Sequence, residues 1–163
     1  MQRIPGCDAL LTETGGLTLL IRTADCLPIL FAHPVRGIVG IAHAGWRGLA
    51  ARLPARVVAA FRHLYQCRAE DLQVAIGPAI HACCYEVGPE FSGRFGRFVH
   101  ERNGRRTCDL IGVAMDQLRS SGVRAEHLVE SARCTACESD HWFSVRREGD
   151  ATGRLTSFIM LRS

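Results

Sequence analysis

The sequence contains no lysine, because all 20 of its basic residues are arginine. Schiff-base catalysis and a phosphate-binding P-loop both need a lysine amine, so the composition excludes both. The arginine bias has two interpretations. One is a GC-rich coding sequence, and the other is recognition of anions, since a guanidinium group binds phosphate through two parallel hydrogen bonds.

Long apolar runs and a secretory signal are also missing. No apolar run reaches the roughly 18 residues that span a membrane, and the first residues lack the apolar region of a signal peptide. Aromatic residues make up only 7% of the chain, and the net charge of +4 is scattered rather than gathered in a basic stripe. We therefore expect a cytoplasmic protein with no membrane or nucleic-acid partner. The length predicts one domain over residues 1–163.

Cysteine is abundant for a cytosolic chain. The eight cysteines are Cys7, Cys26, Cys67, Cys83, Cys84, Cys108, Cys134 and Cys137. We expect no disulfide among them, because a chain of this size can rely on its apolar core. Cys134 and Cys137 form a CxxC pair without a second CxxC nearby, so we expect them to be free of metal. The adjacent Cys83 and Cys84 are not expected to face one metal.

Apolar periodicity predicts a mixture of strands and helices. The predicted strands are 17–21, 27–31, 38–42, 72–76, 142–145 and 155–161. The predicted helices are 49–64, 91–98 and 110–118. Asp109 is the expected N-cap of the last helix. We expect the first three strands to form one β unit with short connections.

Reactive side chains follow two of these strands. Cys26 ends the word Thr-Ala-Asp-Cys after the first strand, and His43 opens the word His-Ala-Gly-Trp-Arg-Gly after the third. Thiolate and imidazole are ligands that zinc and copper prefer. Asp25 is placed to hydrogen-bond a ligand or to bind substrate. The sequence therefore predicts a metal site that uses Cys26 and His43.

Small residues follow His43. Gly45 and Gly48 let the backbone approach a ligand closely, and Arg47 between them is placed to meet an anion. The spacing alone is equally compatible with a core cysteine, a capped loop histidine and a surface arginine.

Several short sequence motifs, taken together, resemble those of one family over nearly the whole chain. They lie in the family's order at 23–26, 43–48, 76–80, 84–88, 134–135, 143–147 and 153–154. The resemblance is to the laccase-domain family, long labelled multicopper polyphenol oxidase, whose members are zinc-dependent purine nucleoside phosphorylases with adenosine deaminase side activity. Bacterial relatives are also linked to editing of peptidoglycan precursors.

The resemblance implies a fold, substrates and residue roles. The fold is an α+β sandwich layered α/β/β/α, with mixed sheets and helices outside, and the substrates are purine nucleosides and phosphate. Cys26 and His43 would bind zinc, with copper as a substitute. Asp25 and Arg47 would be catalytic. Gly45 and Arg146 would bind substrate.

The chain departs from the family at one ligand. The family's third metal ligand is a histidine in a Gln-Val-His-Gly word upstream of the other two, and no such word occurs here. We therefore expect the domain to be truncated at its N-terminus relative to the family, with weak activity and an uncovered surface that favours a homodimer. Two alternatives follow. One is a cysteine hydrolase with Cys26 as nucleophile and His43 as base, and the other is a non-catalytic remnant.

Overall fold

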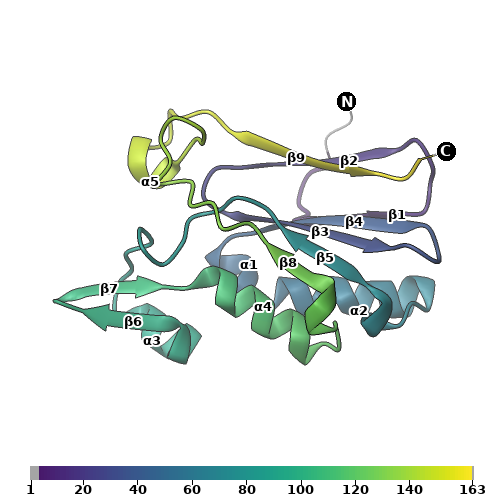
Figure 1. Ribbon diagram of the computed structural model, residues 1–163, viewed down its shortest axis with the longest axis horizontal. Helices are drawn as coiled ribbons and strands as arrows, with labels where there is room; N and C mark the ends of the chain where they lie inside the picture. Colours follow the sequence, from purple (N-terminus) through teal and green to yellow (C-terminus); the bar gives the residue numbers. More distant parts are fainter. Residues whose placement is uncertain (1–3, 163) are drawn as a thin grey trace.

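The computed structural model describes residues 4–162, and its centre is a five-stranded mixed sheet (Figure 1). The strand order is β1-β4-β3-β5-β8, and each neighbouring pair is antiparallel except β5 and β8. The strands are β1 (Ala9–Thr12), β3 (Leu27–His33), β4 (Ile38–Ala44), β5 (Gln73–Ile76) and β8 (Leu128–Glu130). The β3–β4 hairpin lies at the middle of the sheet, and the predicted metal ligands lie at its open end.

Helices cover one face of this sheet (Figure 1). They are α1 (Trp46–Ala50), α2 (Leu53–Tyr65) and α4 (Leu110–Ser120). Alternate residues of β3 point toward them, and Leu27, Ile29 and Phe31 are fully buried there. The rings of Phe31 and Phe61 lie 6.0 Å apart between their centroids. Burial of each such side chain stabilises the fold by roughly 1.5–3 kcal/mol, so this interface is the main core.

A two-stranded ribbon covers the opposite face (Figure 1). It pairs β2 (Thr18–Thr23) with β9 (Leu155–Met160) in antiparallel register. Leu19 of the ribbon packs with Val39 and Ile41 of β4 in a second, smaller core. The predicted α+β sandwich with mixed sheets is confirmed. The described residues place helices on one outer face, and a second outer helix layer is not among them.

The outer side of the ribbon exposes two large apolar side chains. Phe158 is 65% exposed and Met160 is 46% exposed, because β9 alternates between the inner core and solvent. The homodimer expected from the sequence stays a prediction. None of the helices within residues 4–162 is long and apolar enough to cross a membrane.

Two predicted elements and one predicted strand pairing differ from the structure. The predicted helix 49–64 is two helices, because Arg52 between them adopts a left-handed φ of 57°. The predicted strand 142–145 is not a strand, since Ser144 caps the short helix α5 (Val145–Glu148) by accepting a hydrogen bond from the backbone N–H of Arg147. The first predicted strand pairs with β9 in the ribbon rather than with the next two strands.

The other predicted elements were found with shifted ends. Helix 110–118 is present as α4, with the Asp109 carboxylate capping it by accepting from the backbone N–H of Gly112 at 2.8 Å. Helix 91–98 shortens to α3 (Glu90–Phe95), which ends at Gly96 with a φ of +49°. Two short strands, β6 (Val99–Arg102) and β7 (Arg105–Cys108), form a hairpin that the sequence analysis missed.

Candidate metal centre

Strand register places Cys26 and His43 on one face of the sheet. In the β3–β4 hairpin, Leu27 lies opposite Ala44 and Pro28 lies opposite His43. Extending this register by one residue places Cys26 opposite Gly45. Residues two apart on a strand share a face, so Cys26 and His43 are diagonal neighbours, a relation that spans about 7–8 Å between strand positions. Both residues are half-buried, on the face that the ribbon covers.

Gly45 makes room for the thiol of Cys26. A Cβ atom added at Gly45 would lie 2.9 Å from the Cys26 Sγ, closer than real Cβ contacts come. The sulfur therefore lies directly against the Gly45 backbone. The sequence predicted that Gly45 would allow another group to approach the backbone closely, and the group that does so is the Cys26 sulfur. Contact between Gly45 and substrate stays a prediction.

We expect Gly45→Ala to destabilise the protein by about 1–3 kcal/mol, because the new methyl must displace the Cys26 sulfur. Chemical unfolding followed by circular dichroism measures the effect. Gly93→Ala is the matched control, since a Cβ there meets nothing within 4 Å. If both variants were as stable as the parent, Gly45 would not be needed for the position of Cys26.

Asp25 ties together three segments that are distant in the sequence. It is only 8% exposed, and its backbone has a left-handed φ of 82°. The Oδ1 atom accepts a hydrogen bond from the Thr135 hydroxyl at 2.7 Å, and Oδ2 accepts one from the backbone N–H of Arg146 at 2.7 Å. The Asp25 carbonyl accepts from the backbone N–H of Ile80 at 2.9 Å. These contacts give Asp25 a positioning role, and its direct part in catalysis stays a prediction.

The predicted arginines lie around Tyr85, a residue that the sequence analysis did not single out. The Arg146 guanidinium carbon lies 4.8 Å from the centroid of the buried Tyr85 ring. Burial raises the pKa of Tyr85 to about 12, and the charges of Arg146, Cys26 and Arg47 also act on its hydroxyl. These groups therefore share one neighbourhood. The only signal in the sequence was the position of Tyr85 in the Cys-Tyr-Glu-Val-Gly word.

Arg47 is exposed to solvent, whereas the Cys26 thiol is partly buried. The Arg47 guanidinium carbon lies 4.5 Å from the centroid of the Trp46 ring. Burial raises the pKa of the Cys26 thiol, and the carboxylates of Asp25 and Asp8 raise it further. Without a cation beside it, Cys26 is therefore a protonated and weak nucleophile at neutral pH.

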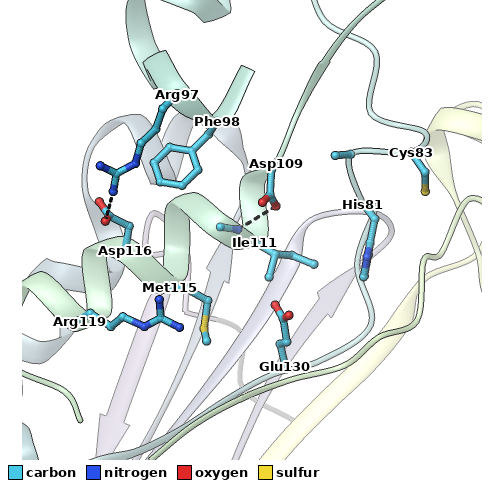
Figure 2. Close-up of a pocket in the computed structure, with 12 residues that line it drawn as sticks. His81, Cys83, Arg97, Phe98, Asp109, Ile111, Met115, Asp116, Arg119 and Glu130 are labelled. Atoms are coloured by element: carbon cyan, nitrogen blue, oxygen red, sulfur yellow. Dashed lines mark hydrogen bonds and ion pairs between the residues drawn. The ribbon is translucent and has the colours of Figure 1, made fainter. Parts of the chain in front are cut away.

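A cavity close to the sulfur-bearing loop of Cys83 does not coincide with this site. Its volume is about 550 Å³, and it lies between the loop of His81 and Cys83 and the start of α4, where Asp109 and Ile111 face it (Figure 2). Neither Cys26 nor His43 lines it. We place the candidate site at the strand ends, because the strand register puts Cys26 and His43 on one face of the sheet there.

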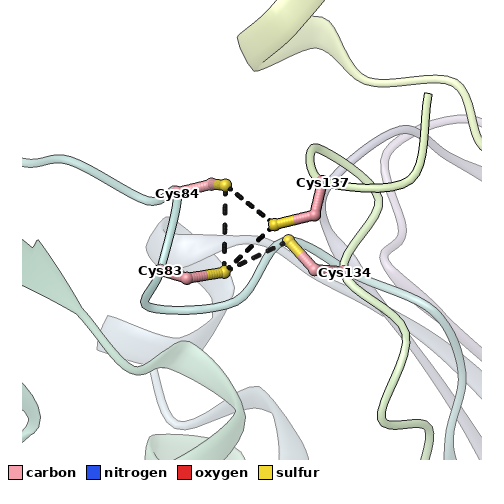
Figure 3. A group of neighbouring side chains, drawn as sticks. All are labelled: Cys83, Cys84, Cys134 and Cys137. Atoms are coloured by element: carbon pink, nitrogen blue, oxygen red, sulfur yellow. Dashed lines mark hydrogen bonds between the residues drawn. The ribbon is translucent and has the colours of Figure 1, made fainter.

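Four further cysteines bring their sulfurs together in a second group. The Sγ atoms of Cys83, Cys84, Cys134 and Cys137 all lie within 4.8 Å of one another (Figure 3). The expectation that adjacent cysteines would not face one site was wrong, since Cys83 and Cys84 both point toward Cys137. All eight cysteines of the chain are unbridged in the structure.

Comparison with known proteins yields a family and several close relatives. The family model described as multi-copper polyphenol oxidoreductase laccase matches residues 1–162. The purine nucleoside phosphorylase YlmD of Geobacillus stearothermophilus is 37% identical, over 96% of this chain and 60% of the relative. Its crystal structure matches with a TM-score of 0.93, over 98% of this chain and 63% of that chain.

Two further relatives carry related names. A purine nucleoside phosphorylase of Deinococcus radiodurans is 41% identical, over 94% of this chain and 61% of the relative. Adenosine deaminase RL5, from an unknown prokaryotic organism, is 35% identical, over 93% of this chain and 61% of the relative. The chain thus spans about three fifths of the length of these relatives. Since the family model covers nearly the whole chain, the chain belongs to the multi-copper polyphenol oxidoreductase laccase family.

Proposed function

We propose that this protein is a purine nucleoside phosphorylase that acts on adenosine, inosine, guanosine or methylthioadenosine, with adenosine deaminase as a side activity. The names of its relatives support the reaction class. The observation that carries the proposal is the shared face of Cys26 and His43, which lies beside two arginines suited to an anion. A metal ligand pair next to guanidinium groups fits a reaction in which phosphate is a substrate.

Cys26 and His43 fit zinc, with copper as a substitute, by their donor chemistry. The room that Gly45 leaves for the Cys26 sulfur shows that the backbone is shaped around this thiol. A zinc ion held there supplies positive charge that polarises phosphate or water. Catalytic zinc usually has three protein ligands. The family resemblance implies a third ligand, a histidine in a Gln-Val-His-Gly word, and this sequence contains no such word.

The remaining residues orient substrates. Arg47 is exposed and free to bind phosphate oxygens through its guanidinium fork. Arg146 is held at its backbone by the Asp25 carboxylate and at its side chain by the Glu86 carbonyl, so its guanidinium is fixed over Tyr85. Fixed donors stabilise a developing anion without the cost of reorganisation. These two arginines form the proposed phosphate site.

The reaction is tested directly with inosine and adenosine. Release of free base together with ribose 1-phosphate, dependent on added phosphate and on zinc, is the expected result. A chelator should abolish it, and Cys26→Ser should abolish it as well. A cysteine hydrolase would survive the chelator, but the raised pKa of the Cys26 thiol gives that alternative no support.

Arg47→Lys should weaken phosphate binding about tenfold, because the ammonium keeps the charge but loses the paired hydrogen bonds, which are worth roughly 1.5–3 kcal/mol. Calorimetric titration of the zinc-loaded protein with phosphate measures the change. Arg62→Lys, at an exposed position of α2, is the matched control. Equal phosphate affinity in Arg47→Lys and in the control would remove Arg47 from the phosphate site.

A further inference from the structure

We propose that Cys83, Cys84, Cys134 and Cys137 form a second metal site, a closed tetrathiolate site for zinc. It is separate from the pair Cys26 and His43. The four cysteines lie in two turns that are about fifty residues apart in the sequence, and their sulfurs converge on one point (Figure 3).

The spacing of the sulfurs fits a single zinc ion. The Cys83 Sγ lies 3.8 Å from that of Cys84, 3.6 Å from that of Cys134 and 3.4 Å from that of Cys137, and the Cys84 and Cys137 sulfurs are 3.2 Å apart. Four sulfurs at a zinc–sulfur distance of about 2.3 Å form a tetrahedron with edges of about 3.8 Å. These four spacings, 3.2–3.8 Å, lie at or somewhat below that edge, and all six lie within 4.8 Å. An iron–sulfur cluster has several metal atoms at its centre, so it needs its cysteines further apart.

The backbone brings the two turns together without help from the thiols. Ala79 and Cys134 form an isolated parallel β-bridge, in which the Thr135 N–H donates to the Ala79 carbonyl at 3.0 Å. The His81 N–H then donates to the Cys134 Sγ at 3.4 Å. Backbone N–H groups aimed at sulfur favour the thiolate form, which is the form that binds metal.

Positive charge lies next to the cluster. Four thiolates around one Zn²⁺ carry a net charge of −2, which must be offset in a partly buried position. The Arg147 guanidinium donates to the carbonyls of Thr135 at 2.7 Å and Ala136 at 3.1 Å, both inside the turn between Cys134 and Cys137. Arg147 thus holds the CxxC turn in shape with a guanidinium group, which also pairs with the Glu148 carboxylate.

The arrangement indicates a structural site. Four protein ligands leave zinc no open position for substrate, as in structural zinc sites elsewhere. One turn continues into Tyr85, and the other carries Thr135, whose hydroxyl holds the Asp25 carboxylate. A metal that joins the two turns therefore fixes the two loops that border the candidate active site.

The zinc content of purified variants tests for the tetrathiolate site. We expect Cys137→Ser and Cys83→Ser, both at exposed positions, to lose one zinc per chain relative to the parent when all are purified under reducing conditions. Cys7→Ser is the matched control, because Cys7 is also exposed but lies outside the cluster. The tetrathiolate zinc should persist in Cys26→Ser, which separates this site from the proposed catalytic one.

Cobalt gives a spectroscopic readout that does not depend on the zinc content of the purified protein. Co²⁺ added to the metal-free parent should give the intense thiolate charge-transfer and tetrahedral ligand-field bands of a CoS₄ site, and these bands should persist in Cys26→Ser. Equal zinc content in Cys137→Ser, Cys83→Ser and the parent would overturn the proposal. The same holds for an absent CoS₄ spectrum, or for a mass two protons low after anaerobic purification, which would indicate a disulfide.

Discussion

Asp25→Asn is expected to destabilise the protein by about 2–4 kcal/mol, since breaking hydrogen bonds to a buried charged group leaves donors unpaired. Both carboxylate oxygens accept hydrogen bonds, one from Thr135 and one from the backbone of Arg146. An asparagine amide has one oxygen, so its NH₂ group must face one of these donors. For a domain of this size, such a loss lowers the melting temperature by roughly 4–16 °C.

Thermal unfolding at neutral pH measures this effect. Asp140→Asn is the matched control, because Asp140 is exposed and its carboxylate accepts a hydrogen bond from the neighbouring, exposed Ser139. Asp25→Glu is a second informative variant, since it keeps the charge but lengthens the side chain inside a tight turn. If Asp25→Asn melted at the same temperature as Asp140→Asn, the junction of the three segments would not depend on the carboxylate.

The central strands could be predicted because each signal is local. The runs at 27–31 and 38–42 are apolar on both faces, which is typical of strands buried between two layers. The break at Arg52 could not be predicted, because the helical pattern of apolar residues continues across it and arginine rarely adopts a positive φ. The short strands β6, β7 and β8 carry few buried side chains, so periodicity gave no signal for them.

The part of the candidate site that lies on the β3–β4 hairpin could be predicted, because its residues are close in the sequence. Cys26 directly precedes β3 and His43 lies near the end of β4, so the short β3–β4 hairpin brings them to one edge. The junction at Asp25 depends on Thr135, which lies 110 residues away. The sulfur cluster depends on contacts between Cys83 and Cys134 over 51 residues. No local pattern encodes such contacts, and they form only when the loops meet after folding.

We expect the 163-residue chain alone to be at least 10–100-fold less active on inosine than the same chain extended upstream through a Gln-Val-His-Gly segment. Loss of a partner that supports a metal ligand typically costs 10–100-fold in affinity or activity, and loss of a ligand should cost no less. The described residues supply Cys26 and His43, and catalytic zinc sites commonly use three protein ligands. Turnover with phosphate and added zinc is the measurement.

An extended chain in which the added histidine is alanine separates two causes. The extension could raise activity by covering the exposed apolar side of the ribbon, where Phe158 and Met160 face solvent, as well as by supplying a ligand. The alanine version covers the same surface but offers no imidazole. If it matched the histidine version, covering alone would explain the gain. If the 163-residue chain matched both, Cys26 and His43 would suffice, and the hypothesis of an inactive remnant would be lost because the short chain itself turns over substrate.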